Sequence, residues 1–126
     1  MIIIGDTIDH GYQKKLNTLI DELKIKKKVI FKGRVENEEL IKYYKNCRVF
    51  VFPSLVETFG NTLLEAMSFG KAIACSETAA MPEVLGDCGV YFNPEDEFDI
   101  ANKIELLLAN DKLSIKLGRK AMQRAD

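Results

Sequence analysis

Short apolar runs alternate with segments of helical periodicity along the whole chain. The runs are rich in Val, Ile and Phe and show no polar alternation, which is typical of strands that are covered on both faces. They cover residues 2–4, 29–31, 49–52, 72–75 and 90–92. We therefore expect five short, buried strands of a parallel sheet.

Between these runs, apolar residues recur at three- and four-residue intervals, which predicts amphipathic helices. We expect Phe98, Ala101, Ile104 and Leu108 to form the buried face of one of them. The alternation of strand and helix predicts a doubly wound α/β fold in which residues 1–126 form one domain. The expected helices cover residues 11–23, 37–46, 61–69, 96–109 and 111–125, with one helical turn at 81–85.

Composition excludes several classes of protein. The chain has 126 residues, 47% of them hydrophobic, and no apolar run approaches the roughly 20 residues that a membrane helix needs. A net charge of −1 gives no reason to expect a nucleic-acid partner. Cys47, Cys75 and Cys88 have no metal-ligand spacing, so we interpret them as reduced core residues of a cytoplasmic protein.

Charge is unevenly distributed along the chain. Residues 14–48 contain eleven Lys or Arg and five acids, whereas residues 76–111 contain nine acids and one Lys. Favourable charge at a helix C-terminus followed by a solvated loop explains the tightest basic cluster. A peripheral contact with the inner face of a membrane is the alternative. The cluster consists of Lys24, Lys26, Lys27 and Lys28.

The most informative segment follows the strand at residues 49–52. Pro53 ends this strand, and a turn that contains Gly60 leads into the helix at 61–69. Free N–H groups and the positive end of the dipole make such a helix start a seat for a phosphate. Glu57 and Glu65 flank this seat, and carboxylates accept hydrogen bonds from sugar and ribose hydroxyls. The segment therefore suggests a sugar-nucleotide site.

A purely structural interpretation of the same glutamates stays open at this point. Thr62 and Glu65 have the spacing of a capping box, in which the Glu65 carboxylate accepts from a backbone N–H group. Glu57 is equally compatible with a solvated loop. His10 follows Asp9 at an expected helix start, which favours a structural role for the single histidine.

A longer motif surrounds the two glutamates. It contains, in order, Pro-Ser at 53–54, Glu-x-Phe-Gly at 57–60, Leu-Glu-Ala-Met at 64–67 and a glycine at 70. This pattern resembles the signature of the family 4 retaining glycosyltransferases. Residues 29–35 with the helix after them, and residues 80–89, are similar to further parts of that family. The resemblance covers nearly the whole chain.

The resemblance implies a Rossmann-like parallel sheet flanked by helices. It corresponds to the C-terminal, donor-binding domain of the GT-B arrangement, without that domain's first strand–helix unit. It also implies a hexosyltransferase that moves sugar from a nucleotide-diphosphate sugar to a saccharide or lipid-linked acceptor. The expected setting is cell-surface polysaccharide or glycolipid synthesis, with no cofactor and no metal. A cytoplasmic location, peripheral to the inner membrane face through the lysine cluster, is the expected one.

The resemblance also implies roles for individual residues. Glu57 is the expected catalytic residue and faces the donor sugar, while Glu65 accepts from the ribose hydroxyls. Polar Thr58 and Asn61 depart from the family pattern, which leaves the identity of the donor sugar open. The expected donor-sugar residues are Glu57, Phe59, Gly60 and Asn61, and the expected nucleotide-binding residues are Gly33, Arg34, Val35, Asn61, Thr62, Leu63 and Glu65.

The family's usual Arg and Lys of the first strand–helix unit are not found before Ile2. We therefore expect the chain to need an N-terminal domain of the same parent for transfer, and to be inactive alone. In the strand order 3-2-1-4-5-6 the first strand is central. Without it, the strands at 2–4 and 49–52 either pair directly or each expose an edge, and exposed edges favour self-association.

Two other functions remain as alternatives. A sugar-nucleotide epimerase of the same fold binds a similar donor without transferring it, although the two-glutamate run favours the transferase. A response-regulator-like interaction module needs an acidic pocket at the first strand end. Asp6 follows that strand, but no second acid stands beside it in the sequence. The alternative also needs a phosphorylatable Asp after a central strand, and Pro53 and Ser54 occupy the end of the next one.

Overall fold

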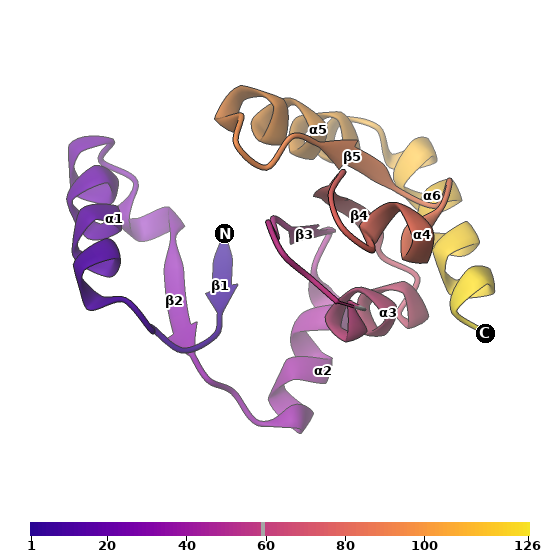
Figure 1. Cartoon of the computed structure of the whole chain (residues 1–126), viewed down its shortest axis with the longest axis horizontal. Coiled ribbons are helices and arrows are strands. Elements are labelled where there is room, and N and C mark those ends of the chain that lie inside the picture. Colours follow the sequence, from indigo (N-terminus) through magenta and orange to yellow (C-terminus); the bar gives the residue numbers. More distant parts are fainter. Residues whose placement is uncertain (59) are drawn as a thin grey trace. The chain divides into compact units, whose positions relative to one another are not determined.

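The computed structural model describes residues 1–58 and 60–126. Phe59, one of the expected donor-sugar residues, lies outside the described residues. The elements alternate between strand and helix until the last two helices (Figure 1). They are β1 (Ile2–Ile4), α1 (His10–Glu22), the 3₁₀ helix η1 (Lys26–Lys28), β2 (Ile30–Gly33), α2 (Asn37–Asn46), β3 (Val49–Phe52), α3 (Asn61–Ser68), β4 (Ala72–Ser76), α4 (Met81–Leu85), β5 (Val90–Phe92), α5 (Glu97–Ala109) and α6 (Asp111–Ala125).

The chain consists of two compact units, residues 1–41 and residues 42–126. In the first unit, β1 pairs in parallel with β2, and Ile2 lies opposite Ile30. The register shifts between Ile3 and Ile4, so that Ile4 lies opposite Gly33. Asp9 caps α1, and its side chain accepts from the Tyr12 N–H group at 2.9 Å. The expectation of a single domain over residues 1–126 stays a prediction.

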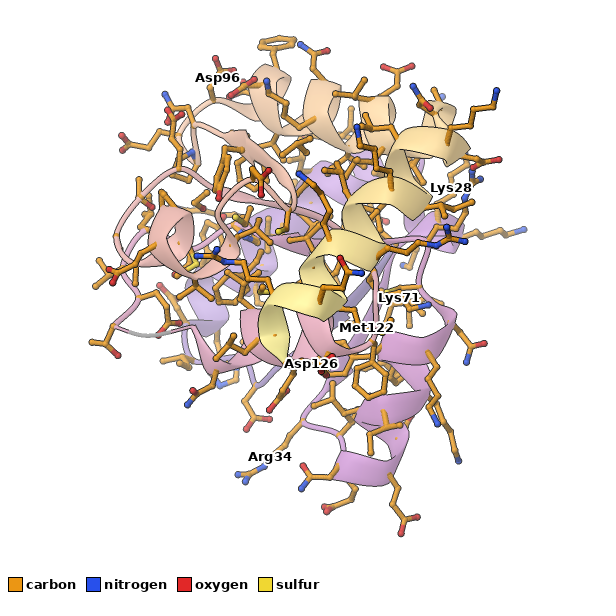
Figure 2. The ribbon with its side chains drawn as sticks, turned by 90° about the vertical axis from the view of Figure 1, so that its right-hand side faces the viewer. Lys28, Arg34, Lys71, Asp96, Met122 and Asp126 are labelled. Atoms are coloured by element: carbon orange, nitrogen blue, oxygen red, sulfur yellow. The ribbon has the colours of Figure 1, made fainter. Side chains whose placement is uncertain are left out.

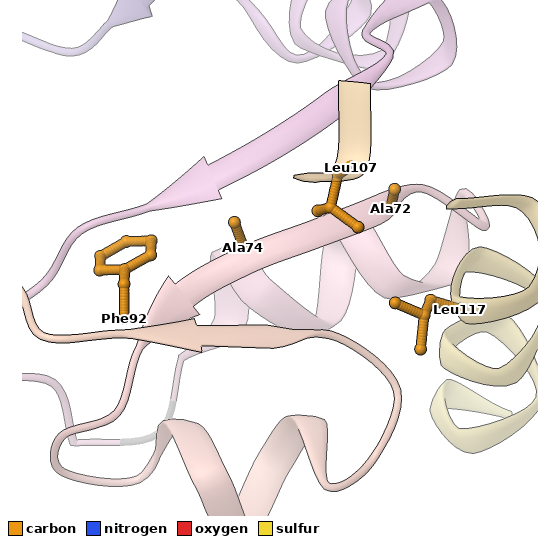
Figure 3. Packing of buried hydrophobic residues seen from close by; sticks show 5 residues of the cluster. All are labelled: Ala72, Ala74, Phe92, Leu107 and Leu117. Atoms are coloured by element: carbon orange, nitrogen blue, oxygen red, sulfur yellow. The ribbon is translucent and has the colours of Figure 1, made fainter. Parts of the chain in front are cut away.

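In the second unit, β3, β4 and β5 form a parallel sheet in that order. All five residues of the central strand β4 are buried, because the sheet is covered on both faces. Helix α5 packs on β3, β4 and β5, whereas α3 packs on α4 and α6. Figure 3 shows the core beside α5 and α6, which consists of Ala72, Ala74, Phe92, Leu107 and Leu117.

The described residues thus contain two parallel sheets, one in each unit. Within its own sheet, β1 has β2 as its hydrogen-bonded neighbour, and β3 has β4. The two alternatives for the strands at 2–4 and 49–52, direct pairing or two exposed edges, concern how the units meet, and both stay predictions. Self-association through these edges stays a prediction.

The predicted parallel α/β fold is confirmed, and the element bounds agree within two residues. The expectation that all five strands are buried is wrong for β1 and β2, most of whose residues are exposed. The predicted face of α5 is wrong: Phe98 is 74% exposed and Leu108 is 41% exposed. Ala101 is exposed as well, and Ile104 is partly buried. The helix instead buries the side on which Leu107 is almost completely covered. Apolar residues occur on several sides of α5, so that spacing alone did not identify the covered one.

A glycine contact fixes the position of α6 against the end of α3. Gly70, with φ of +63°, follows α3 in the left-handed conformation that ends many helices. A Cβ atom at Gly118 of α6 would lie 2.2 Å from the Gly70 carbonyl oxygen. Only a glycine at position 118 permits this approach of a helix to a backbone.

We expect Gly118→Ala to destabilise the second unit, although alanine favours a helix more than glycine does. The added methyl group has to displace backbone, and overpacking of this kind costs about 1–3 kcal/mol. Urea unfolding followed by circular dichroism measures the change in free energy. Arg119→Ala, at the exposed neighbouring position, is the control. Equal stability of the two variants would contradict the close contact.

The cysteines allow a second test of the core. Burial raises the pKa of the Cys75 thiol to about 12, and its side chain is completely covered. Because the thiolate is the reactive form, we expect iodoacetamide at pH 8 to leave Cys75 unmodified in the folded chain. Mass spectrometry before and after addition of urea checks this, and all three cysteines should react once the chain unfolds. Rapid modification of Cys75 without urea would show that β4 is not buried.

Candidate functional site

The turn between β3 and α3 has a conformation that suits a glycine. Gly60 is buried, has φ of +78° and ψ of 43°, and is the N-cap of α3. A Cβ atom here would lie 3.3 Å from Cε of Met81 in α4. No side chain caps α3, although the Gly60 carbonyl accepts from the N–H groups of Leu63 and Leu64 at 2.8 and 3.1 Å. The positive end of the helix is therefore available to a ligand.

Glu57 lies in the turn beside Gly60. Its Cγ atom would be 3.8 Å from a Cβ atom at Gly60, and the side chain is half-buried. Oε1 accepts from the backbone N–H group of Thr58 at 3.0 Å. The structure therefore places one expected acid at the start of the turn, with a carboxylate whose position is partly fixed by the backbone.

Glu65 lies one turn into α3 and is exposed. Its Oε2 accepts a hydrogen bond from the Tyr44 hydroxyl at 2.9 Å. The capping box of Thr62 and Glu65 is wrong, because the N-cap of α3 is Gly60, two residues before Thr62. The Glu65 carboxylate is thus directed by a side chain of α2 and not by the backbone of its own helix.

Tyr44 of α2 is part of the candidate site, although nothing in the sequence indicated it. Its side chain is 4% exposed, and its ring stacks on Phe69 at 5.3 Å and 11°. Phe50 of β3 contacts the same ring at 5.7 Å and 51°. Burial, and then the hydrogen bond to Glu65, raise the pKa of the Tyr44 phenol, so it remains a donor. A buried tyrosine needs a polar partner, but the sequence does not reveal which one.

The three residues expected beside the phosphates differ in burial. Asn61 and Thr62 lie exposed in the first turn of α3, and their side chains are able to donate hydrogen bonds. Leu63 is fully buried, and its backbone N–H group already donates to Gly60. Asn61 and Thr62 are therefore the positions that α3 presents to an anion.

The expected base-binding loop follows β2 in the first unit. Gly33 has φ of +64°, and its carbonyl accepts from the Gly5 N–H group at 2.9 Å. The Asp6 carboxylate accepts from the Arg34 N–H group at 3.1 Å, which ties the ends of β1 and β2 together. Arg34 is exposed and its side chain extends outward (Figure 2), while Val35 is half-buried. Asp6 therefore has a structural partner in this loop.

The lysine cluster surrounds the end of α1. Lys24 has φ of +55° just after the C-cap, and Lys26–Lys28 form η1. Lys26 pairs with Asp21 at 3.7 Å, and both side chains are well exposed. This geometry agrees with the interpretation of the cluster as charge near a helix C-terminus followed by a solvated loop. An exposed ion pair of this kind contributes little to the free energy of folding. The membrane contact stays a prediction.

No three His, Cys, Asp or Glu side chains among the described residues are grouped so that they could hold a metal ion. None of their helices is both long enough and apolar enough to span a bilayer.

Comparison with known proteins identifies the family. The family model described as "Glycosyl transferases group 1" matches residues 1–124. The O-antigen chain mannosyltransferase B of Escherichia coli is 42% identical over 79 residues, which are 63% of this chain and 21% of that protein. The chain thus spans about a fifth of the length of this relative.

Solved structures agree with the fold. The C-terminal domain of a group 1 glycosyl transferase (LpcC) from Francisella tularensis is 27% identical, with a TM-score of 0.87 over 98% of this chain and 66% of that one. HepE from Anabaena, in complex with UDP and glucose, has a TM-score of 0.91 at 23% identity, over 98% of this chain and 35% of that one. Because the family model covers almost every residue, this chain belongs to the group 1 glycosyl transferases.

Proposed function

We propose that this chain binds the nucleotide-diphosphate sugar donor of a retaining hexosyltransferase. One observation carries the proposal: α3 begins at the left-handed Gly60 with no side-chain cap, between the carboxylates of Glu57 and Glu65. A helix start of this kind binds a diphosphate. Carboxylates on both sides add acceptors for the hydroxyl groups of a sugar and a ribose.

Glu65 accepts from the ribose hydroxyls in this proposal. Tyr44 donates to Oε2, and an ionised carboxylate has about four acceptor positions, so Oε1 in particular remains for the ligand. Asn61 and Thr62 receive the phosphates at the start of α3, whereas the N–H group of Leu63 already donates to the Gly60 carbonyl. The loop of Gly33, Arg34 and Val35 contacts the base.

Glu57 faces the donor sugar and is the proposed catalytic residue. Phe59, Gly60 and Asn61 complete the sugar site, where a Gly60 without a Cβ atom allows close approach of the ligand. Negative charge grows on the leaving diphosphate as the glycosidic bond breaks. The N-terminus of α3 stabilises this charge electrostatically, and no metal ion is part of the proposal.

The proposed parent protein acts in cell-surface polysaccharide or glycolipid synthesis, on a saccharide or lipid-linked acceptor. The name of the Escherichia coli relative, an O-antigen chain mannosyltransferase, supports this setting. The complex of HepE with UDP and glucose supports a nucleotide-sugar donor. The family match favours a transferase over an epimerase. An N-terminal domain holds the acceptor, and Lys24, Lys26, Lys27 and Lys28 face an anionic membrane on its cytoplasmic side.

Calorimetric titration with UDP, GDP and ADP, and with their hexose conjugates, tests the donor site. We expect saturable binding of one base class, and Glu65→Gln should weaken it at least about tenfold because a charge-assisted hydrogen bond to the ribose is lost. The variant keeps an oxygen that accepts from Tyr44, so its fold should be unchanged by circular dichroism.

Glu105→Gln is the matched control, since Glu105 is an exposed helical glutamate of α5 and the change in charge is the same. It should bind the nucleotide as the unchanged chain does. A folded chain that binds none of the nucleotides, or binds them equally well with Glu65→Gln, would contradict the proposed function.

A further inference from the structure

We propose that Tyr44 is a positioning residue for the nucleotide: its hydroxyl holds the Glu65 carboxylate in the orientation that accepts the ribose hydroxyls. This inference rests on the proposed function, because it assigns Tyr44 a role that acts through Glu65. It adds a residue from α2 to the part of the site that α3 and the turn before it build.

The first argument is the geometry of the contact. The Tyr44 hydroxyl donates to Oε2 of Glu65 at 2.9 Å, although the two residues are 21 positions apart in the chain. Glu65 of α3 and the C-cap residue Phe69 are four positions apart, so their side chains lie on the same side of the helix. The Tyr44 ring stacks on Phe69, and its hydroxyl reaches the carboxylate one turn earlier.

The second argument is the contrast in mobility between the two partners. Tyr44 is 4% exposed, and aromatic rings on either side of it, Phe69 and Phe50, fix its plane. Glu65 is exposed, and a glutamate side chain loses considerable rotamer freedom when a ligand fixes it. A rigid donor that already holds Oε2 removes part of this cost before the nucleotide arrives.

The third argument is that the core does not need a carboxylate as the partner of a buried phenol. Tyr91 in β5 satisfies its hydroxyl with a backbone carbonyl, that of Gly86. Tyr44 instead donates to a charged side chain whose residue is open to solvent. Its phenol stays protonated because burial and Glu65 raise its pKa, so the hydroxyl remains a hydrogen-bond donor.

Calorimetry with UDP and GDP, each compared with its 2′,3′-dideoxy counterpart, separates positioning from a general loss of structure. The unchanged chain should prefer the ribonucleotide, because the dideoxy form has no hydroxyl groups for Glu65. Tyr44→Phe should weaken ribonucleotide binding about three- to tenfold, the usual effect of one hydrogen bond. It should leave dideoxynucleotide binding unchanged, whereas a structural defect would weaken both.

Tyr91→Phe is the matched control, since it removes the hydroxyl of a tyrosine outside the site. It should leave the preference for the ribonucleotide unchanged, even where it lowers the thermal midpoint. Phe69→Leu is a second variant that keeps the Tyr44 hydroxyl and removes the stacked ring. It should reduce the preference by a smaller factor, and it carries the test if Tyr44→Phe does not fold.

The outcomes distinguish this inference from the proposed function. If Glu65→Gln abolishes the preference for the ribonucleotide while Tyr44→Phe and Phe69→Leu retain it, the role of Tyr44 is overturned and the ribose site stands. If the unchanged chain shows no preference, and Glu65→Gln binds as it does, the ribose site itself is overturned and the role of Tyr44 with it.

Discussion

The close approach of α6 to the turn after α3 is the constraint on which the second unit depends. Gly118 lies against the Gly70 carbonyl, and no larger residue fits there. The contact sets the C-terminal end of α3, while the buried Leu63 and Met67 hold the body of the helix. Because a helix is rigid over two turns, the same contact determines where the N-terminus of α3 points. The geometry of the candidate site therefore begins at the opposite end of its helix.

A second set of contacts, through α4, connects α6 to the turn before α3. The Arg124 guanidinium donates to the carbonyls of Glu83 and Val84 at 2.8 and 2.7 Å, where α4 ends. Met81, at the other end of α4, is completely buried and adjoins Gly60. Charge-assisted bonds to carbonyls at a helix C-terminus are favourable because they satisfy groups that the helix leaves unpaired. Helix α4 thus packs against the turn before α3, and the hydrogen bonds from Arg124 of α6 hold the end of α4.

Local patterns in the sequence predicted the elements well because strong signals mark their ends. Pro53 ends β3, and Gly70 separates α3 from β4, so the bounds of these elements follow from backbone chemistry. Glu57 and Gly60 could be placed in one turn for the same reason. The face of α5 could not be predicted, since apolar residues occur on several of its sides and only tertiary packing selects one.

Local sequence patterns did not predict the hydrogen-bond partner of Glu65 either. The spacing of Thr62 and Glu65 fits a cap, but the left-handed Gly60 starts the helix earlier and releases the carboxylate. Tyr44 of α2 reaches it because its ring stacks on that of Phe69, the C-cap residue of α3. No periodicity reports a contact of this kind between separate helices.

The glycine contact between α3 and α6 also has a consequence for the order of events during synthesis. A ribosome completes β3, the turn and α3 well before it reaches Gly118, because Gly118 lies 48 residues after Gly70 in the sequence. Until then, the surface of α3 that α6 covers is exposed to water, and the direction of the helix is not yet fixed. The turn before α3, although made earlier, therefore acquires its final geometry only after α6 has been synthesised.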